Sequence, residues 1–345
     1  MSFSASVRWV FCHQQRPPER IQVHRHSWGT IIVSRTTKPS VGVIGLGSMG
    51  MGVARTLVAK GFPTHAFDIR ASARNAFVKA GGTTYRNPAD MASQCDIVIV
   101  LVVNANQTNE VLLGKNGALS TLRTGSVVVA SATVPPEFAA SLGEQLDKQG
   151  VLMIDAPVSG GAARAAKGEL SIMASGEQKA FRKAKPVLDA IAAKVYRLGD
   201  TCGMGSKVKM INQLLAGVHI ASACEAMALG IRAGADPKVL YEVISNSAGS
   251  SWMFQNRVPH ILEGDYTPLS AVSIFVKDLG IVLDTAKTLN FPAPLTAAAH
   301  QLYLSAAGAG LSGEDDSAVI KVYQQLTGIE LPKARRKKKS ARKRT

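Results

Sequence analysis

Lys209, Asn212 and Gln213 are the side chains of this sequence whose types and spacing best suit joint chemistry. Positions i, i+3 and i+4 lie on one face of a helix. A helix is expected because residues 206–233 contain no proline and consist mostly of strong helix formers. Gly203 and Gly205, just before it, can bring the backbone close to a cleft. A lysine beside two amides at the start of a helix favours a functional site. The alternative is that Lys209 is a solvated surface lysine.

The length of this helix restricts what it can be. About 28 residues at 1.5 Å each span roughly 42 Å, as in a coiled coil, a membrane span or a wall between domains. Polar residues interrupt the apolar run, and no segment offers 18 consecutive apolar residues, which argues against a membrane span. No heptad register persists, which argues against a coiled coil. We therefore expect a helix between two domains.

A second set of chemistry-bearing residues lies between two predicted strands, at residues 41–45 and 63–67. The turn between them is Gly45, Leu46, Gly47, Ser48, Met49 and Gly50, followed by a helix to Lys60. This is the arrangement that binds a dinucleotide. Gly45 permits the tight turn, Gly47 lets the backbone approach a pyrophosphate, and Gly50 lets helix and strand pack closely. The helix N-terminus supplies N–H donors to the phosphates.

Asp68 ends the second strand of this unit and bears on the choice of cofactor. A carboxylate there accepts hydrogen bonds from the adenosine ribose and repels a 2′-phosphate. Arg70 lies two residues further on and softens that repulsion. The sequence therefore predicts NAD in preference to NADP.

The remaining pattern predicts an α/β fold: an N-terminal Rossmann domain with a doubly wound parallel sheet, then the long interdomain helix, then an all-helical C-terminal domain. Apolar runs at 97–103, 126–130, 151–154, 170–174 and 195–198 predict strands. Helices are expected at 107–113, 136–148 and 178–193 in the first domain, and at 238–246, 250–261, 269–288, 294–306 and 315–326 in the second. Ser159, Gly160 and Gly161 follow a strand and open a helix, where N–H groups can hold a carboxylate.

Four elements in order closely resemble the β-hydroxyacid dehydrogenase family, which includes 3-hydroxyisobutyrate dehydrogenase and tartronate semialdehyde reductase. They are residues 45–50, 155–161, 203–212 and 277–279. The resemblance covers residues 41–331. It implies domains at 40–201 (NAD-binding) and 202–331 (interdomain helix with a helical substrate and dimerisation domain), and a homodimer or homotetramer.

The resemblance also implies roles for individual residues. Lys209 would be catalytic, and Ser159, Gly160, Gly161, Asn212 and Gln213 would bind the substrate. The cofactor residues would be the glycine turn, Asp68, Val102, Val103, Thr133 and Lys277. One loop departs from the family pattern, which often has Leu-Pro and then an asparagine where this chain has Val102, Val103 and Gln107. No metal is implied.

The chemistry follows from these residue types. Oxidation of a secondary alcohol needs a base for the hydroxyl proton while hydride leaves carbon for the nicotinamide. A lysine qualifies only if its pKa falls, which burial and a nearby cation such as Lys277 both achieve. Residues 216–220, 251–254, 264–268 and 315–321 resemble the family branch that oxidises the four-carbon sugar acid L-threonate at C2. The alternatives are 3-hydroxyisobutyrate or tartronate semialdehyde as substrate.

The positive charge of the chain lies in its ends. Residues 1–40 carry +5 and residues 332–345 carry +9 of the net charge of +16, so the rest carries +2. The basic tail motivates a remote alternative, a silent nucleic-acid-bound scaffold. Residues 1–39 are expected to be a disordered or spurious leader, with a transit segment as the alternative. Four cysteines without CxxC pairing or metal-ligand spacing suit a reducing compartment, the cytoplasm.

We predict that both ends are dispensable for catalysis, because neither has a periodic apolar face to offset the entropy of ordering it. A variant covering residues 39–332 should retain full dehydrogenase activity and lose most of any affinity for DNA, measured by steady-state kinetics and filter binding. Loss of activity on truncation would contradict this.

Overall fold

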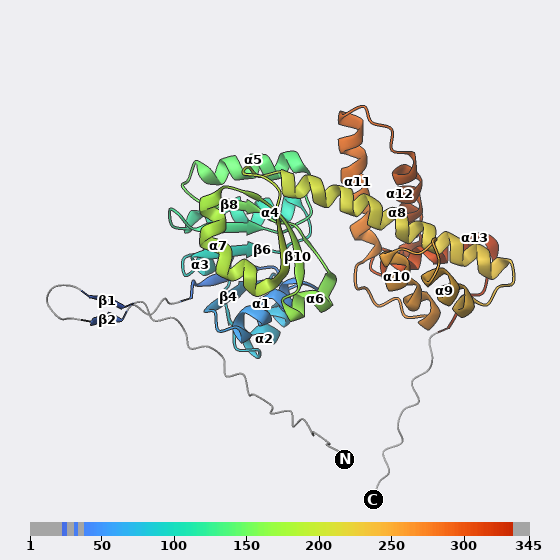
Figure 1. Ribbon diagram of the computed structural model, residues 1–345, viewed down its shortest axis with the longest axis horizontal. Helices are drawn as coiled ribbons and strands as arrows, with labels where there is room; N and C mark the ends of the chain where they lie inside the picture. Colours follow the sequence, from blue (N-terminus) through green and yellow to red (C-terminus); the bar gives the residue numbers. More distant parts are fainter. Residues whose placement is uncertain (1–22, 26–30, 34–37, 334–345) are drawn as a thin grey trace, which may run out of the picture. The chain divides into compact units, whose positions relative to one another are not determined.

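The computed structural model describes residues 23–25, 31–33 and 38–333 of the chain (Figure 1). The strands β1 (Val23–Arg25) and β2 (Ile31–Val33) pair antiparallel with each other. Pro39–Thr345 forms a separate compact unit. Most of the expected leader and nearly all of the basic tail lie outside the described residues, so these two expectations stay predictions, as does the domain boundary at residues 201 and 202.

One nine-stranded sheet organises the N-terminal half of this unit (Figure 1). Its strands run in the order β11-β10-β8-β7-β6-β3-β4-β5, and β9 pairs with β10. From β5 to β8 all pairs are parallel, in the order typical of a Rossmann fold. The strands are β3 (Val41–Ile44), β4 (Thr64–Phe67), β5 (Thr83–Thr84), β6 (Ile97–Val100), β7 (Val127–Ala130), β8 (Leu152–Asp155), β9 (Val158–Ser159), β10 (Leu170–Gly176) and β11 (Ala192–Arg197).

Both faces of the sheet are covered, because its central strands are apolar at every position. Alternate residues enter different cores: Ile97 and Ile99 join one cluster, whereas Val98 and Val100 join the other. The covering helices are α1 (Gly50–Ala59), α2 (Ala71–Val78), α3 (Pro88–Ala92), α4 (Ala105–Leu113), α5 (Pro136–Asp147), α6 (Gly161–Lys167) and α7 (Gln178–Ile191), with a 3₁₀ turn at Ala118–Ser120.

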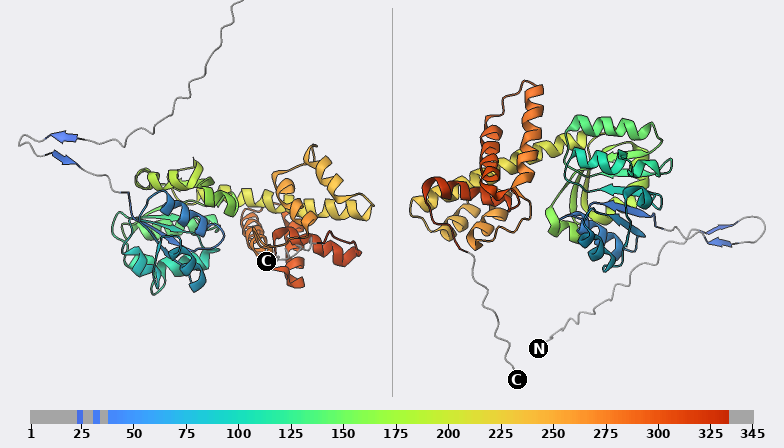
Figure 2. Two further views of the ribbon diagram at one scale, coloured as in Figure 1. Left: turned by 90° about the horizontal axis from the view of Figure 1, so that it is seen from below. Right: turned by 180° about the vertical axis from the view of Figure 1, so that it is seen from behind.

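The helix α8 (Met204–Arg232) leads out of the sheet and forms the spine of an all-helical half (Figures 1 and 2). It packs against β10 at one end and against α10, α11 and α12 further along. By length and composition alone, α8 would also pass as a membrane span. Of the apolar stretch of 18 residues within α8 that meets this criterion, 39% is buried in the protein. The other elements are α9 (Pro237–Ser245), α10 (Trp252–Glu263), α11 (Val272–Thr288), α12 (Pro294–Ala306), a π turn at Ala307–Leu311, a 3₁₀ turn at Asp316–Val319 and α13 (Ile320–Thr327).

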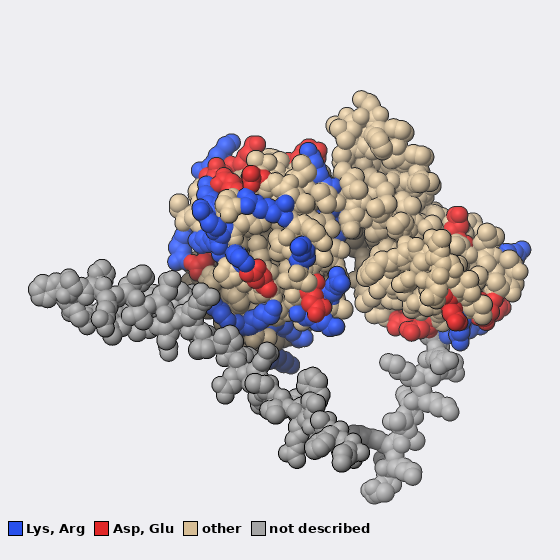
Figure 3. All heavy atoms as spheres, in the orientation of Figure 1, with Lys and Arg blue, Asp and Glu red and all other residues tan. Residues whose placement is uncertain are grey.

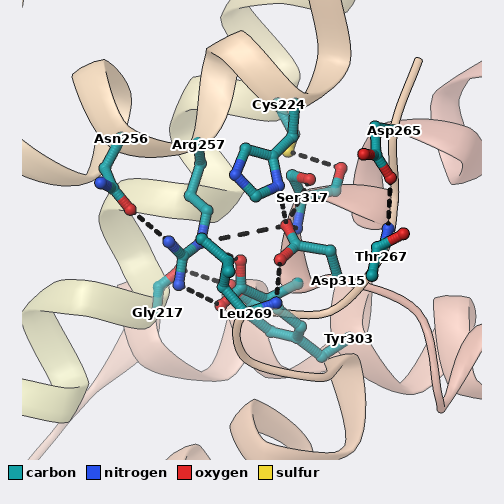
Figure 4. Close-up of polar contacts among 12 residues, drawn as sticks. Gly217, Cys224, Asn256, Arg257, Asp265, Thr267, Leu269, Tyr303, Asp315 and Ser317 are labelled. Atoms are coloured by element: carbon teal, nitrogen blue, oxygen red, sulfur yellow. Dashed lines mark hydrogen bonds and ion pairs between the residues drawn. The ribbon is translucent and has the colours of Figure 1, made fainter. Parts of the chain in front are cut away.

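A buried charge cluster fixes the segment that leads into α11 (Figure 4). The Arg257 guanidinium donates to both carboxylate oxygens of Asp316, at 2.5 and 3.1 Å. Leu269 N–H donates to Asp315 Oδ2 at 3.0 Å, and Val272 N–H donates to the Glu314 carbonyl at 2.9 Å. Burial raises the pKa of Asp316 to about 6, against the opposing effect of Arg257. The cluster thus holds the start of the helix that carries Lys277.

The predicted fold class is confirmed, and so are most of the expected elements. The expected strand at 97–103 is wrong in length, because β6 ends at Val100. The expected strand at 195–198 begins earlier, since β11 pairs with β10 from Ala192. The elements α2, α3, β5 and β9 were not expected from the sequence, because each is short and carries little apolar periodicity. The helix expected to open after Ser159 is present as α6.

The Asp155 carboxylate joins the sheet to the first turn of α8. Its Oδ2 accepts from Gly203 N–H at 3.0 Å and Ser206 N–H at 2.8 Å, and its Oδ1 accepts from the Ser206 hydroxyl at 2.7 Å. A side chain at Gly205 would place its Cβ 2.5 Å from the Met173 carbonyl oxygen, so only glycine allows this close approach. The end of β8 therefore caps α8.

Asp155→Ala should lower the free energy of unfolding by about 3 kcal/mol, because it leaves buried N–H donors of α8 without an acceptor. Chemical denaturation measures the change. The matched control is Glu169→Ala, an exposed carboxylate, which should change stability by less than about 0.5 kcal/mol. Equal effects of the two substitutions would show that Asp155 does not anchor α8.

Candidate active site

The glycine turn between β3 and α1 has the geometry of a phosphate cradle. Gly45 has a φ of +93°, and a Cβ there would lie 2.5 Å from the Leu101 carbonyl oxygen. A Cβ at Gly50 would lie 1.8 Å from the Gly45 carbonyl oxygen, whereas nothing lies within 4 Å of the Cβ position of Gly47. No side chain caps α1, and its first turn carries no acidic residue. The turn thus combines an uncapped helix N-terminus with open space at Gly47, which suits a pyrophosphate.

Asp68 lies at the end of β4, beside this turn. Its carboxylate accepts from Leu46 N–H at 2.7 Å and from Arg70 N–H at 2.8 Å, and it forms an ion pair with the Arg70 guanidinium at 3.1 Å. Burial acts to raise the pKa of Asp68, but the hydrogen bonds from Arg70 and Leu46 outweigh it and the pKa lies below its usual value. Asp68 is therefore an anion held at the cofactor edge of the sheet.

Lys209 lies in the second turn of α8 with only 7% of its surface exposed. Its Nζ donates to Gln213 Oε1 at 2.7 Å, one helical turn further on. Burial lowers the pKa of Lys209 to about 8; Asp278 opposes this effect and Lys277 adds to it. Lys207, two residues before it, is exposed. Lys209 thus gives up its proton more readily than an exposed lysine does.

The predicted group on α8 is joined to α11 by hydrogen bonds. Gln213 Oε1 also accepts from Asn212 Nδ2 at 3.0 Å, and Gln213 Nε2 donates to Asp278 Oδ2 at 2.5 Å. The Lys277 ammonium bonds to the other oxygen of Asp278 and donates to the Thr133 carbonyl at 2.9 Å. A continuous series of hydrogen bonds therefore connects Lys209 with the loop after β7.

Asp278 and Asp155 are the residues that sequence reasoning missed. An adjacent lysine and aspartate on a helix are most often surface charges that face different directions. Asp278 is instead 1% exposed and bonds to Gln213 and Lys277. The available signal was its position directly after Lys277, a predicted cofactor residue. Asp155 stood at the head of a predicted loop, but nothing in the sequence indicated that it caps α8.

The other predicted residues lie in loops at the ends of strands. Ser159 ends β9, and Gly160 and Gly161 have φ angles of +126° and +69° and start α6, with open space at the Cβ position of Gly161. Val102 and Val103 follow β6, and Val103 N–H donates to Gln107 Oε1 at 2.9 Å. Two hollows border α5, one lined by Thr108, Ala132 and Asp155 and the other by Glu144, Asp200 and Cys202, among others; Lys209 lines neither.

Comparison with known proteins defines the class. Residues 40–199 match the model of the NAD-binding domain of 6-phosphogluconate dehydrogenase, and residues 203–323 match that of the NAD-binding domain of NADP-dependent 3-hydroxyisobutyrate dehydrogenase. Together with the phosphate cradle, these matches define a dehydrogenase that uses NAD(P).

Three proteins with high similarity extend this result. The chain is 62% identical to L-threonate dehydrogenase of Cupriavidus necator over 85% of this chain and 98% of that protein. It is 50% identical to L-threonate dehydrogenase of Haemophilus influenzae over 85% of this chain and 97% of that protein. A crystal structure of 3-hydroxyisobutyrate dehydrogenase from Salmonella typhimurium matches with a TM-score of 0.79 and 49% identity. The match covers 83% of this chain and 100% of that chain. The chain belongs to the 3-hydroxyisobutyrate dehydrogenase-like family of hydroxyacid dehydrogenases.

We predict that Lys209→Ala lowers kcat at least about a hundredfold, since a positioned acid–base group contributes roughly 10²–10⁴-fold. The affinity for NAD, measured by titration of protein fluorescence, should change little. Lys207→Ala is the matched control and should leave kcat nearly unchanged. If the two variants have similar turnover, Lys209 is not the base.

The rate of alcohol oxidation should rise as the pH increases through about 8, because only neutral Lys209 can accept a proton. Asp278→Asn removes a negative charge that favours the ammonium form, so the midpoint of the kcat profile should move to lower pH. Profiles of kcat against pH for both proteins measure the shift. A midpoint that moves to higher pH would contradict this assignment.

Proposed function

We propose that this protein oxidises L-threonate at C2 to the corresponding 2-oxo acid, with NAD as hydride acceptor. The observation that carries the proposal is Lys209, a buried lysine whose pKa falls to about 8. Hydrogen bonds through Gln213, Asp278 and Lys277 link it to the loop after β7. The named activity of relatives at 62% and 50% identity supports the choice of substrate.

Each group of residues has a part in this reaction. Ser159 and the N–H groups of Gly160 and Gly161 hold the substrate carboxylate at the start of α6. Asn212 and Gln213 orient the hydroxyl, and Lys209 Nζ takes its proton. Gln213 can hold one orientation only, because its amide nitrogen faces Asp278. The glycine turn, Asp68, Val102, Val103, Thr133 and Lys277 form the cofactor side, and NAD, when bound, accepts the hydride.

The deciding experiment is a substrate panel. Steady-state kinetics with L-threonate, D-threonate, D-erythronate and 3-hydroxyisobutyrate, followed by NADH absorbance, should give the highest kcat/KM for L-threonate. The related Salmonella structure bears the name of a 3-hydroxyisobutyrate dehydrogenase. A higher kcat/KM for 3-hydroxyisobutyrate would therefore replace the proposed substrate, and absence of turnover with every acid would refute the function.

NAD is proposed over NADP because Asp68 presents a carboxylate where a 2′-phosphate would lie. Wild-type protein should show the higher kcat/KM with NAD, and Asp68→Ala should narrow the difference by removing the repulsion. Arg70→Ala should widen it, since Arg70 is the cation that pairs with Asp68. Equal or better turnover of the wild type with NADP would contradict the preference.

Location and assembly are part of the same proposal. We place the enzyme in the cytoplasm, in keeping with the free state of Cys95, Cys202 and Cys224 in the described part of the chain. A homodimer or homotetramer is expected for the functional protein. Contact with nucleic acid through the basic tail concerns residues outside the described ranges and stays a prediction.

A further inference from the structure

The Asp68 carboxylate is saturated with hydrogen bonds. In the part of the chain that the structure describes, four N–H groups donate to its two oxygens. Oδ2 accepts from Leu46 N–H at 2.7 Å and from Arg70 Nη2 at 3.1 Å. Oδ1 accepts from Arg70 N–H at 2.8 Å and from Arg70 Nε at 3.1 Å. Because an ionised carboxylate offers about four acceptor positions, the protein's own donors fill all of them.

The four donors are of two kinds. The N–H groups of Leu46 and Arg70 belong to the main chain, which is fixed beside the sheet by the bond from Gly45 N–H to the Phe67 carbonyl at 2.8 Å. The other two donors belong to the Arg70 guanidinium, whose side chain is 57% exposed. Rotation of this side chain moves them into solvent without moving the backbone. Two of the four positions on Asp68 can therefore be vacated while the carboxylate stays in place.

The guanidinium matches the group that Asp68 is expected to bind. Its N–H groups form a fixed planar fork that suits both oxygens of a carboxylate. The 2′- and 3′-hydroxyls of an adenosine ribose are also two neighbouring donors, and the acid that ends the second strand of this fold accepts from the ribose. Both groups need the same two positions on Asp68, so the presence of one excludes the other.

We propose that the Arg70 side chain is an internal competitor of the adenosine ribose. It occupies the ribose positions on Asp68 in the free protein and turns into solvent when NAD binds. The apparent dissociation constant is the intrinsic one divided by the fraction of molecules in which Arg70 is turned away. This inference rests on the proposed use of NAD and goes beyond it, because it gives a positive side chain a negative effect on the binding of an anionic cofactor.

The same side chain has the opposite effect on NADP. A 2′-phosphate replaces one hydroxyl donor with an anion, which Asp68 repels. The released guanidinium remains close enough to pair with that phosphate. Arg74, the next cation along the chain, is held elsewhere, since its Nη1 donates to the carbonyls of Asp68 and Ile69 at 2.5 and 3.2 Å. Arg70 therefore opposes NAD and favours NADP.

General electrostatics predicts a different result for NAD. Residues 40–201 contain 17 Lys or Arg against 12 Asp or Glu, a net charge of +5. Figure 3 shows basic side chains spread over much of the visible face of this half, with fewer acidic ones. A positive half attracts the anionic pyrophosphate, so the loss of an ordinary lysine or arginine should weaken binding. Tighter binding of NAD after the loss of Arg70 is therefore specific to the competitor.

Titration calorimetry of the full chain with NAD and with NADP, without substrate, tests the proposal. Arg70→Ala should lower the dissociation constant for NAD about two- to fivefold, the range that an exposed ion pair contributes, and should raise the constant for NADP. Lys79→Ala is the matched control, because it removes an exposed positive charge at the other end of α2. This control should raise both constants slightly.

A conservative variant separates the fork from the charge. Arg70→Lys keeps a cation but cannot span both carboxylate oxygens. It should therefore tighten NAD as the alanine variant does, while it retains most of the affinity for NADP. Weaker binding of NAD by Arg70→Lys than by the wild type would overturn the proposal.

The remaining outcomes are equally decisive. An unchanged or higher dissociation constant for NAD in Arg70→Ala overturns the competitor, as does failure of the wild type to bind NAD. A shift of both cofactors in the same direction would show that Arg70 only supports the turn, and would overturn it too. In stopped-flow fluorescence the gain should lie in the association rate, and a gain confined to the dissociation rate contradicts the proposal. A protein that shows these shifts but oxidises no hydroxyacid would refute the proposed function and leave the competitor standing.

Discussion

The capping of α8 by the Asp155 carboxylate is the interaction on which the rest of the site depends. Asp155 is the last residue of β8, and its two oxygens accept three hydrogen bonds from Gly203 and Ser206. Burial raises the pKa of this carboxyl even though hydrogen bonds from α8 oppose the effect. A buried carboxylate needs these donors, and the helix start needs this acceptor. The requirement is mutual, so α8 can start at one place only. The position of Lys209 follows from that starting point by helix geometry.

A second constraint comes from Gln213, which connects the lysine to the other half of the protein. An amide presents an acceptor on one side and donors on the other. Lys209 and Asn212 both donate to the side-chain oxygen of Gln213, and the side-chain nitrogen of Gln213 donates to the Asp278 carboxylate. Asp278 is in turn held by Lys277, which reaches the Thr133 carbonyl after β7. Lys209 is therefore oriented by groups from both the sheet half and the helical half.

The sequence was most informative where local rules act. The glycine turn, the buried strands and the long helix each follow from chain-local sterics or apolar periodicity, and all are present in the structure. Lys209, Asn212 and Gln213 were placed on one face by helix spacing alone, and the bonds to Gln213 agree with this. The roles of Asp155 and Asp278 depend on partners 51 and 65 residues away in the chain, which no local pattern encodes. Short strands such as β5 and β9 are set by tertiary contacts in the same way.

The neighbours of Lys209 also determine the charge around this side chain during the proposed reaction. Lys277 and Asp278 neutralise each other, so a neutral Lys209 leaves the protein side uncharged. A substrate carboxylate and an oxidised nicotinamide ring then add opposite charges. NAD, when bound, would accept the hydride, and Lys209 would take the hydroxyl proton and become positively charged. The total charge of these groups would be unchanged by the chemical step, because the charge of the oxidised ring would be replaced by that of the buried Lys209 ammonium.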